Sequence, residues 1–121
     1  DGKKLMSSFV EALYKSEYMY ETLALGNKKF MGISKISPDS VGRRVDIMIT
    51  TDKEYPFAIL YFTGSAEFNP KMRQTALDLG SSLNEYSLTD IKTKLDMDKE
   101  FHEEKDIFEF LGMEYIEPHL R

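Results

Sequence analysis

Two stretches of the chain carry side chains whose types and spacing suit ligand binding or catalysis. The first is Tyr61-Phe62-Thr63-Gly64-Ser65, continued by Phe68-Asn69 and by Lys71-Met72-Arg73. Glycine lets a backbone approach a ligand closely, and aromatic rings can stack on flat ligands. The second stretch is Arg43-Arg44-Val45-Asp46-Ile47, a β-prone run that contains an aspartate. The remainder of the chain has to bring these groups into position.

Asp46 is unusual because aspartate is depleted in strands, where its side chain loses the turn conformations that it favours. It lies two residues from Arg44 and therefore on the same strand face. One interpretation is a surface ion pair, worth about 0–1 kcal/mol. The other is a metal-binding carboxylate or a general base with a basic neighbour for phosphate, although one aspartate does not complete a Mg²⁺ site. The residues alone leave both open.

The aromatic stretch is open to two interpretations as well. Tyr61 and Phe62 are either core residues before a helix-terminating Gly64, or the wall of a ligand pocket. Asn69 and Arg73 lie four residues apart, so a helix would place both on one face, from which each could donate to a base edge. Such pairs are also common on exposed helices. Pattern alone does not decide between structural and binding roles here.

Other candidate groups are weaker. Asp96 and Asp98 have a D-x-D spacing, but they lie among lysines and glutamates and are interpreted as solvated charge. The two histidines, His102 and His119, have no partner at a telling spacing. We find no Ser/His/Asp set, no Walker phosphate loop and no zinc spacing.

The first half of the chain is predicted to be a helix followed by three strands. Residues 4–16 have an apolar face with helical spacing, formed by Leu5, Met6, Phe9, Val10 and Leu13. Strands are predicted over 18–25 and 28–36, with a turn at Gly26-Asn27 that suggests a hairpin. Residues 37–42 form a loop, and 43–51 the third strand, with Val45, Ile47 and Ile49 on one face.

The second half is predicted to be mainly helical. A helix over 53–62, capped by Thr51 or Asp52, ends at Thr63-Gly64, and a second one ends at Leu79. Pro70 marks either a kink or a start with Asn69 as cap. Residues 81–88 are β-like, 89–98 a polar loop, 105–111 a short helix and 115–116 a final strand residue or two. The order predicts an α+β chain of two lobes meeting near residues 51–55.

Composition narrows the class of protein. The 121 residues are 41% hydrophobic and 31% charged, enough for a core and a solvated surface. The absence of cysteine excludes disulfides and zinc–thiolate sites, and fits a reducing compartment. No apolar run approaches the roughly 20 residues of a membrane span, so no membrane partner is expected. The net charge of -5 argues against a wholly basic surface, yet a local basic patch can still bind phosphate.

In both stretches the chain resembles the C-terminal part of family X DNA polymerases, the group of polymerase beta and polymerase lambda. The segment from Leu60 to Arg73 is similar to the family's dNTP-binding segment, and Arg43–Ile47 to the strand with its third catalytic aspartate. Further matches follow in chain order: Thr22-Leu23, Gly26, Lys29-Phe30-Met31-Gly32, Leu83-Asn84-Glu85-Tyr86, Glu104-Lys105-Asp106-Ile107-Phe108, Leu111, Tyr115 and Glu117-Pro118. The resemblance implies part of a nucleotidyltransferase-type palm sheet over residues 1–52 and a small mixed α/β thumb over 53–121.

The resemblance also implies roles for particular residues. Asp46 would bind the catalytic metal and accept the primer 3′-hydroxyl proton, with Arg44 beside it at the primer terminus. The sugar pocket would be lined by Tyr61, Phe62 and Gly64. Asn69 would contact the incoming base and Arg73 the template strand. Lys28 and Lys29 would lie near the DNA backbone, Tyr55 at the hinge, and Glu85 and Tyr86 among the residues that shift when the thumb closes.

The implied parent activity is template-directed nucleotidyl transfer in gap-filling repair, on primer-template or gapped DNA with a dNTP. Two Mg²⁺ ions, replaceable by Mn²⁺, would assist in-line displacement. A monomer is expected, in the nucleus, or in the cytoplasm or virion if the source is a virus. The alternative is a non-catalytic DNA- or nucleotide-binding module that kept the thumb without the active site.

Three departures from the family pattern qualify this reading. The family's other two catalytic aspartates and its glycine-serine triphosphate motif lie upstream of the position of Asp1, so we expect this chain alone to be inactive. Met48 occupies the position of an arginine that changes partners on closing in some members. Pro70 is a smaller departure.

Overall fold

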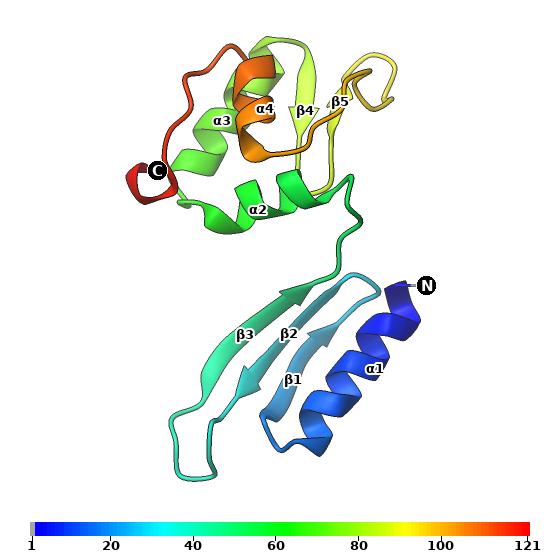
Figure 1. Ribbon diagram of the computed structural model, residues 1–121, viewed down its shortest axis with the longest axis vertical. Helices are drawn as coiled ribbons and strands as arrows, with labels where there is room; N and C mark the ends of the chain where they lie inside the picture. Colours follow the sequence, from blue (N-terminus) through cyan, green and yellow to red (C-terminus); the bar gives the residue numbers. More distant parts are fainter. Residues whose placement is uncertain (1) are drawn as a thin grey trace. The chain divides into compact units, whose positions relative to one another are not determined.

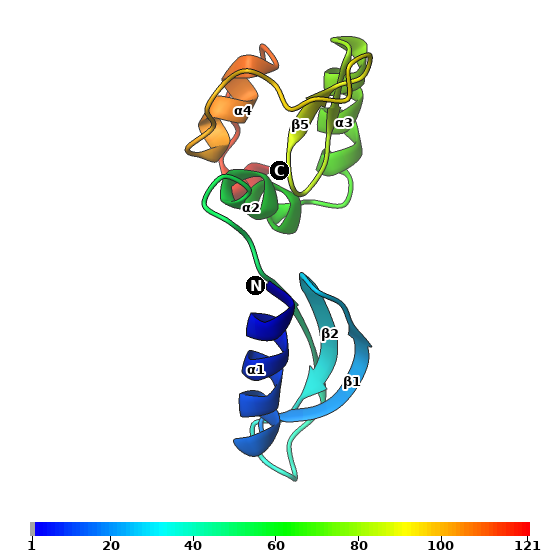
Figure 2. The same cartoon turned by 90° about the vertical axis from the view of Figure 1, so that its right-hand side faces the viewer.

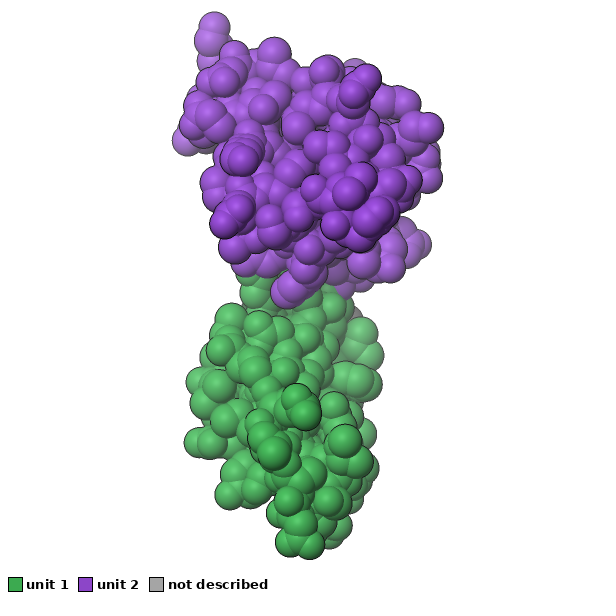
Figure 3. Space-filling view, turned by 90° about the vertical axis from the view of Figure 1, so that its left-hand side faces the viewer, with its two compact units in different colours: residues 1–49 green, residues 50–121 purple. Residues whose placement is uncertain are grey.

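The computed structural model describes residues 2–121, and it contains two compact units. Unit 1 extends to Ile49, and unit 2 runs from Thr50 to Arg121 (Figure 3). Each unit has its own apolar core. Helices and small antiparallel sheets occur in both units, which confirms the α+β class. No helix within the described residues is long and apolar enough to cross a membrane.

Unit 1 consists of one helix on a three-stranded antiparallel sheet. Its elements are α1 (Gly2–Lys15), β1 (Met19–Leu25), β2 (Lys29–Ser34) and β3 (Arg43–Met48). The strand order is β1-β2-β3, and each strand pairs with the next one in the sequence. The predicted helix, hairpin and third strand are therefore confirmed, and their ends agree with the prediction to within three residues. Figures 1 and 2 show α1 along one face of this sheet.

The core of unit 1 is narrower than the sequence pattern predicts. Met6 and Val10 of α1 are buried with Met19 and Phe30, whereas Leu5 and Phe9 are exposed. Met6 and Val10 are one helical turn apart, so α1 contacts the sheet along a single line of side chains. The expected apolar face of five residues was therefore partly wrong, because only one edge of that face meets the sheet.

A close approach between a ring and a backbone fixes β2 in its position. Phe30 is fully buried, and Gly32 lies two residues along the same strand face. A Cβ atom added at Gly32 would lie 2.6 Å from the Phe30 ring and 2.8 Å from the Glu21 carbonyl oxygen. Only glycine therefore lets the ring fold back over the strand while β1 remains paired on the other side.

Unit 2 combines helices with a short hairpin. Its elements are α2 (Tyr55–Thr63), α3 (Phe68–Asp78), β4 (Ser81–Leu83), β5 (Leu88–Asp90), α4 (Glu104–Phe110) and the 3₁₀ helix η1 (Pro118–Leu120). In Figure 2, α3 and the hairpin lie on one side of this unit and α4 on the other, with α2 below both. The buried core includes Phe57, Leu60, Phe68, Met72, Ala76, Leu83, Leu88, Ile107, Phe108 and Leu111.

Two sequence predictions in unit 2 were wrong. The polar loop predicted from Thr89 begins later, because β5 extends to Asp90 and Thr89 also bridges to Asp96. The strand residues predicted at Tyr115 and Ile116 are not a strand, and the chain turns instead into η1 at Pro118. Sequence pattern misses the end of β5 because Thr89 and Asp90 are polar, although both pair with β4 across a short turn.

Side chains outside the helices accept hydrogen bonds next to the starts of α2 and α3. The cap predicted at Thr51 or Asp52 was wrong, because α2 begins at Tyr55 after Glu54 and has no side-chain cap; the Glu54 N–H donates to the Thr51 hydroxyl at 3.2 Å in the turn before the helix. The Phe68 N–H donates to the Ser65 hydroxyl at 3.1 Å, so α3 starts before Asn69, and Asn69 is not its cap. Pro70 lies in the first turn of α3, where its missing N–H does no harm.

The start of α4 is held by a carboxylate. Asp106 accepts hydrogen bonds from the backbone N–H groups of His102 at 2.8 Å and Glu103 at 3.2 Å. These bonds favour the ionised carboxylate, and they lower the pKa of Asp106 below its usual value of 3.8. The cap is therefore charged at neutral pH, at the positive end of the helix dipole.

Substitution of Gly32 by alanine tests the packing of unit 1. We expect Gly32→Ala to lower the free energy of unfolding by about 1–3 kcal/mol, because the new methyl group overlaps the Phe30 ring and a backbone oxygen. Chemical denaturation followed by circular dichroism measures the loss. Gly2→Ala is the matched control, since its Cβ would meet only an ordinary 3.6 Å contact. Equal stability of the two variants would contradict the packing described here.

Candidate active site

Asp46 lies on β3 of unit 1, on the sheet face opposite to the core. The neighbouring Ile47 packs against the core and pairs with Phe30, so alternation turns Asp46 to the other face, beside Met31. The Asp46 side chain is 37% exposed, and its Oδ1 accepts a hydrogen bond from Arg44 Nε at 2.8 Å. Arg44 Nη2 contacts the Met31 sulfur at 3.0 Å. The carboxylate is thus accessible and held by a cation.

Lys28 and Lys29 lie at the end of unit 1 where β1 turns into β2. Lys29 pairs with Met48 at the end of β3, and the Lys28 carbonyl accepts a hydrogen bond from the Ile49 N–H at 2.8 Å. Lys28 is exposed and Lys29 half-buried. The two backbones are therefore fixed by sheet pairing, and both side chains make further contacts of their own.

The end of α2 presents two aromatic rings to solvent. Tyr61 is 36% exposed and Phe62 is 50% exposed, and their rings meet edge to face at 5.1 Å. The helix is apolar on all sides, yet only one side, with Phe57 and Leu60, is buried. Exposed apolar surface of this kind is typical of a ligand-binding or partner-binding face.

The chain leaves α2 through an unusual backbone. Gly64 has φ +70° and ψ −151°, a region that side-chain-bearing residues rarely occupy. The peptide bond from Gly64 to Ser65 is cis. A glycine is therefore required here, and the turn carries the chain directly into α3.

Asn69 connects α3 back to α2. Its side-chain amide donates to the Tyr61 carbonyl at 2.9 Å. Tyr61 is among the last four residues of α2, whose carbonyls have no partner within the helix, so this bond satisfies an otherwise orphan acceptor. The structure brings Tyr61, Asn69 and Arg73 together around one shallow hollow, as the four-residue spacing on α3 predicts.

Arg73 is held by two groups in the same neighbourhood. Its guanidinium lies 5.5 Å from the centre of the Tyr61 ring and 3.6 Å from a carboxylate oxygen of Glu85. Glu85 is in the turn between β4 and β5, so its position depends on that hairpin. The hollow therefore has an aromatic wall, an amide and a cation, and its volume of about 10 Å³ is roughly that needed for one water molecule.

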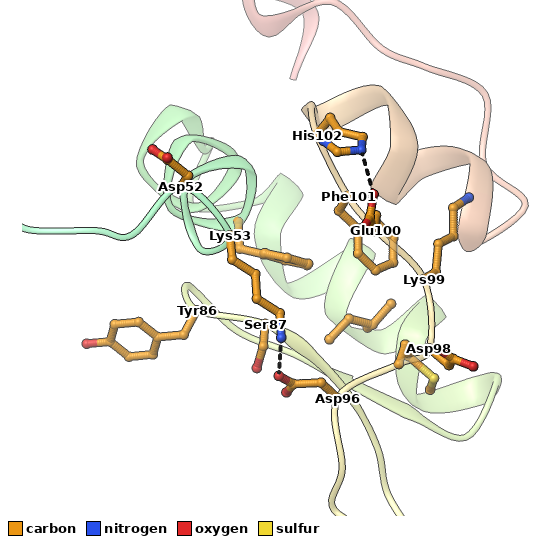
Figure 4. A pocket seen from close by; sticks show the side chains of 13 residues that line it. Asp52, Lys53, Tyr86, Ser87, Asp96, Asp98, Lys99, Glu100, Phe101 and His102 are labelled. Carbon is orange, nitrogen blue, oxygen red and sulfur yellow. Dashed lines mark hydrogen bonds and ion pairs between the residues drawn. The ribbon is translucent and has the colours of Figure 1, made fainter.

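Tyr55 and Tyr86 lie outside this hollow. Tyr55 is the exposed first residue of α2. Tyr86 borders a larger pocket of about 700 Å³, and its side chain points away from the other lining residues in Figure 4. The structure thus places these two residues apart from Tyr61, Asn69 and Arg73 within unit 2.

The larger pocket was missed by the sequence analysis. Its floor includes Phe57 and Phe101, whose rings meet edge to face at 5.2 Å. Across its mouth Lys53 pairs with Asp96 at 3.3 Å, and His102 lies 3.2 Å from Glu100 (Figure 4). No sequence signal marks it, because its lining comes from three separate segments. Its lining carries charges of both signs, and two pairs of them are in contact.

The described residues do not form a metal site by themselves. No group of three histidine, aspartate or glutamate side chains within residues 2–121 could hold an ion. Asp46 offers one carboxylate, and the cation beside it is Arg44. A hard cation such as Mg²⁺ needs several oxygen ligands. The carboxylate predicted as a metal ligand at Asp46 is thus accessible, but the donors among residues 2–121 do not by themselves fit a metal ion.

Comparison with known proteins identifies the class. Residues 1–52 match the family described as DNA polymerase beta palm, and residues 58–121 match the family described as DNA polymerase beta thumb. The chain belongs to the family X DNA polymerases and comprises palm and thumb segments of that family.

Individual relatives agree with this assignment. Over 75% of this chain, the sequence is 35% identical to rat (Rattus norvegicus) DNA polymerase lambda. Over 98% of this chain, it is 34% identical to Xenopus laevis DNA nucleotidylexotransferase. It is 32% identical to the Bacillus subtilis DNA polymerase/3'-5' exonuclease PolX over 64%. It spans only 18%, 24% and 13% of these proteins, respectively.

Solved structures of Leishmania infantum polymerase beta resemble the whole chain. A ternary P/T complex has a TM-score of 0.85 and 34% identity, and covers 97% of this chain and 52% of the solved one. A ternary gap complex has a TM-score of 0.86 and 32% identity, with 97% and 49% covered. The fold of this chain is therefore that of about half of each solved chain.

The hydrogen bond from Asn69 to Tyr61 makes a testable contribution to stability. We expect Asn69→Ala to lower the free energy of unfolding by about 0.5–1.5 kcal/mol, since it removes the donor to the Tyr61 carbonyl. Asn69→Asp should cost more, because an ionised carboxylate would face that oxygen. Urea denaturation measures both. Gln74→Ala is the control on the same helix, where the lost partner is the exposed Asp78. A stable Asn69→Asp variant would contradict this role.

Proposed function

We propose that this chain is part of a DNA-directed DNA polymerase that fills gaps during repair, by template-directed nucleotidyl transfer. The observation that carries the proposal is the likeness of the chain, over 97% of its length, to polymerase beta solved as ternary P/T and gap complexes. Both units match in chain order, with palm before thumb. The longer protein, called the parent below, acts on primer-template or gapped DNA and a dNTP.

In this proposal Asp46 accepts the proton of the primer 3′-hydroxyl. Its outward face and exposed carboxylate support that role, because a general base has to reach the reacting group. Arg44 holds one carboxylate oxygen and lies at the primer terminus. Asp46 also supplies one ligand to a divalent metal, Mg²⁺ or its substitute Mn²⁺, whose other ligands come from outside this chain.

The dNTP-binding roles fall to the end of α2, the turn at Gly64 and the first two turns of α3. Tyr61, Phe62 and Gly64 line the sugar pocket, where exposed rings and a close backbone disfavour a ribose. Asn69 contacts the incoming base, and Arg73 the template strand. Support comes from the shared hollow of Tyr61, Asn69 and Arg73, which presents stacking surface and hydrogen-bond donors together.

The remaining site residues are assigned to contacts with the DNA backbone and to the closing motion of the thumb. Lys28 and Lys29 lie along the DNA backbone, to which a cationic side chain is drawn. Tyr55 belongs to the hinge, and Glu85 and Tyr86 to the residues that shift when the thumb closes.

The same proposal includes the domain assignment, with the palm over 1–52 and the thumb over 53–121. It also includes a monomeric parent, located in the nucleus, or in the cytoplasm or virion of a viral system.

The donor set of the chain predicts that it does not polymerise alone. Since one carboxylate does not hold two metal ions, the isolated chain should give no extension of a primer at a single-nucleotide gap with Mg²⁺. The parent, assayed in parallel, should extend it. Binding of gapped DNA by the isolated chain should be weak and should fall steeply with salt. Robust extension by the isolated chain would refute the prediction and favour a complete site within these residues.

Asp46→Ala in the parent tests the chemical role of the carboxylate. We expect turnover in gap filling to fall by at least about 100-fold, the scale of general-base catalysis, with little change in the Kd for gapped DNA. Single-turnover kinetics and a DNA-binding titration measure the two effects. Asp39→Ala, in the exposed loop before β3, is the matched control and should leave both unchanged. Equal losses of turnover and binding would instead assign Asp46 a structural role.

A further inference from the structure

Arg121 is a buried cation that none of the roles above uses. Its side chain is 0% exposed, and that of its partner Glu104 is 13% exposed. Nη1 lies 2.6 Å from Glu104 Oε2, and Nε donates to the Ile116 carbonyl at 2.8 Å. A buried ion pair often contributes less to stability than apolar residues of the same size would. A reason other than stability is therefore needed for a guanidinium at this position.

The surroundings of Arg121 are aromatic and come from three segments. Its guanidinium carbon lies 5.0 Å from the centre of the Phe108 ring, 5.5 Å from that of Tyr115 and 5.9 Å from that of Phe68. Phe108 belongs to α4, Tyr115 to the segment before η1, and Phe68 is the first residue of α3. A planar guanidinium can face several rings and keep its hydrogen bonds, which an ammonium cannot do equally well.

The geometry of the Arg121–Glu104 ion pair also indicates that Arg121 holds neighbouring segments in position. Nη1, Nη2 and Glu104 Oε2 are buried, and none makes a well-aligned hydrogen bond within the described residues. The 2.6 Å contact is thus a close but poorly directed ion pair. A group that leaves buried donors unsatisfied weakens the fold, and such groups need an explanation. The connections that Arg121 makes between segments supply one.

The ring contacts of Arg121 lead to the part of unit 2 to which the proposed function assigns nucleotide binding. Phe68 stacks on Phe108 at 6.0 Å, and the next residue after Phe68 is Asn69, whose amide reaches the Tyr61 carbonyl. α3 otherwise packs against β4, and α4 against α2. The stack of Arg121, Phe108 and Phe68 therefore links the first turn of α3 to α4.

We propose that Arg121 is a positioning residue for the first turn of α3, and through it for the Asn69 amide that meets the incoming nucleotide. This inference rests on the proposed function for its kinetic consequence, but not for its structural one. Lysine at position 121 would keep the charge and lose the planar fork, and methionine would keep much of the volume and lose the charge. Both should let the first turn of α3 move.

The structural test is hydrogen exchange in the parent protein. In Arg121→Lys we expect faster exchange of the Phe68 and Asn69 amides, which donate to the hydroxyl and the carbonyl of Ser65, while the sheet of unit 1 stays protected. Lys105→Met is the control, because it removes an exposed cation from α4. Unchanged exchange at the start of α3, or equal acceleration throughout unit 2, would overturn the proposal. This arm does not depend on polymerase activity.

The kinetic test separates positioning from simple destabilisation. Arg121→Lys should raise the KM for the incoming nucleotide about tenfold with kcat nearly unchanged, since a displaced Asn69 weakens nucleotide binding. General loss of folded enzyme would lower the apparent kcat without raising KM, and would count against the proposal. The effects of Arg121→Lys and Asn69→Ala on KM should be less than additive, because they act on one contact. Full additivity would also overturn it.

Failure of the two proposals can be told apart. A parent with no gap-filling activity, but with the local change in hydrogen exchange, would refute the proposed function and leave the positioning role of Arg121 standing. If the parent is active, and Arg121→Lys changes neither the hydrogen exchange of α3 nor the KM, the positioning role of Arg121 is refuted and the proposed function stands. A thermal melt of each variant shows whether it is folded. If Arg121→Met does not fold, Arg121→Lys still tests the positioning role.

Discussion

Ile47 packs against the core of unit 1, and because side chains alternate along a strand its neighbour Asp46 must face the other side. That register depends in turn on β2, where the Phe30 ring folds over Gly32 and pairs with Ile47 across the ladder. A slip of one residue would bury the carboxylate and expose the core. The apolar packing of α1 against the sheet therefore determines which chemistry β3 can offer.

In unit 2 the corresponding constraint is the junction between α2 and α3. Gly64 provides a backbone that other residues rarely adopt, and the Ser65 hydroxyl accepts a hydrogen bond from the first residue of α3, so a short turn joins the two helices. Asn69 then returns to the Tyr61 carbonyl. A donor that satisfies a helix end is also fixed in direction, so under the proposed function this hydrogen bond would serve both stability and recognition. The exposed apolar side of α2 is left beside it.

Local patterns predicted the elements whose signals are local. The hairpin at Gly26-Asn27 and the helix break at Thr63-Gly64 follow from turn chemistry and from the conformational freedom of glycine. The end of β5 was misjudged because Thr89 and Asp90 are polar residues that nevertheless pair with β4, and the segment at Tyr115 leads into η1 rather than forming a strand. The sequence pattern also did not predict which aromatic side chains are exposed, because nothing in it separates exposed Phe62 from buried Phe57. Arg121 gave no signal at all, because its rings come from three segments.

Under the proposed function, the two units carry different parts of nucleotidyl transfer. The aromatic surface, the oriented amide and the paired arginine of unit 2 would bind the nucleotide, and none of them is a reacting group. In unit 1 the accessible carboxylate of Asp46 would accept a proton, and it does not by itself fit a metal ion. In that proposal, selection of a nucleotide and activation of a hydroxyl are encoded in separate units of the chain. Substitutions in unit 2 should therefore act first on binding, and those at Asp46 on the chemical step.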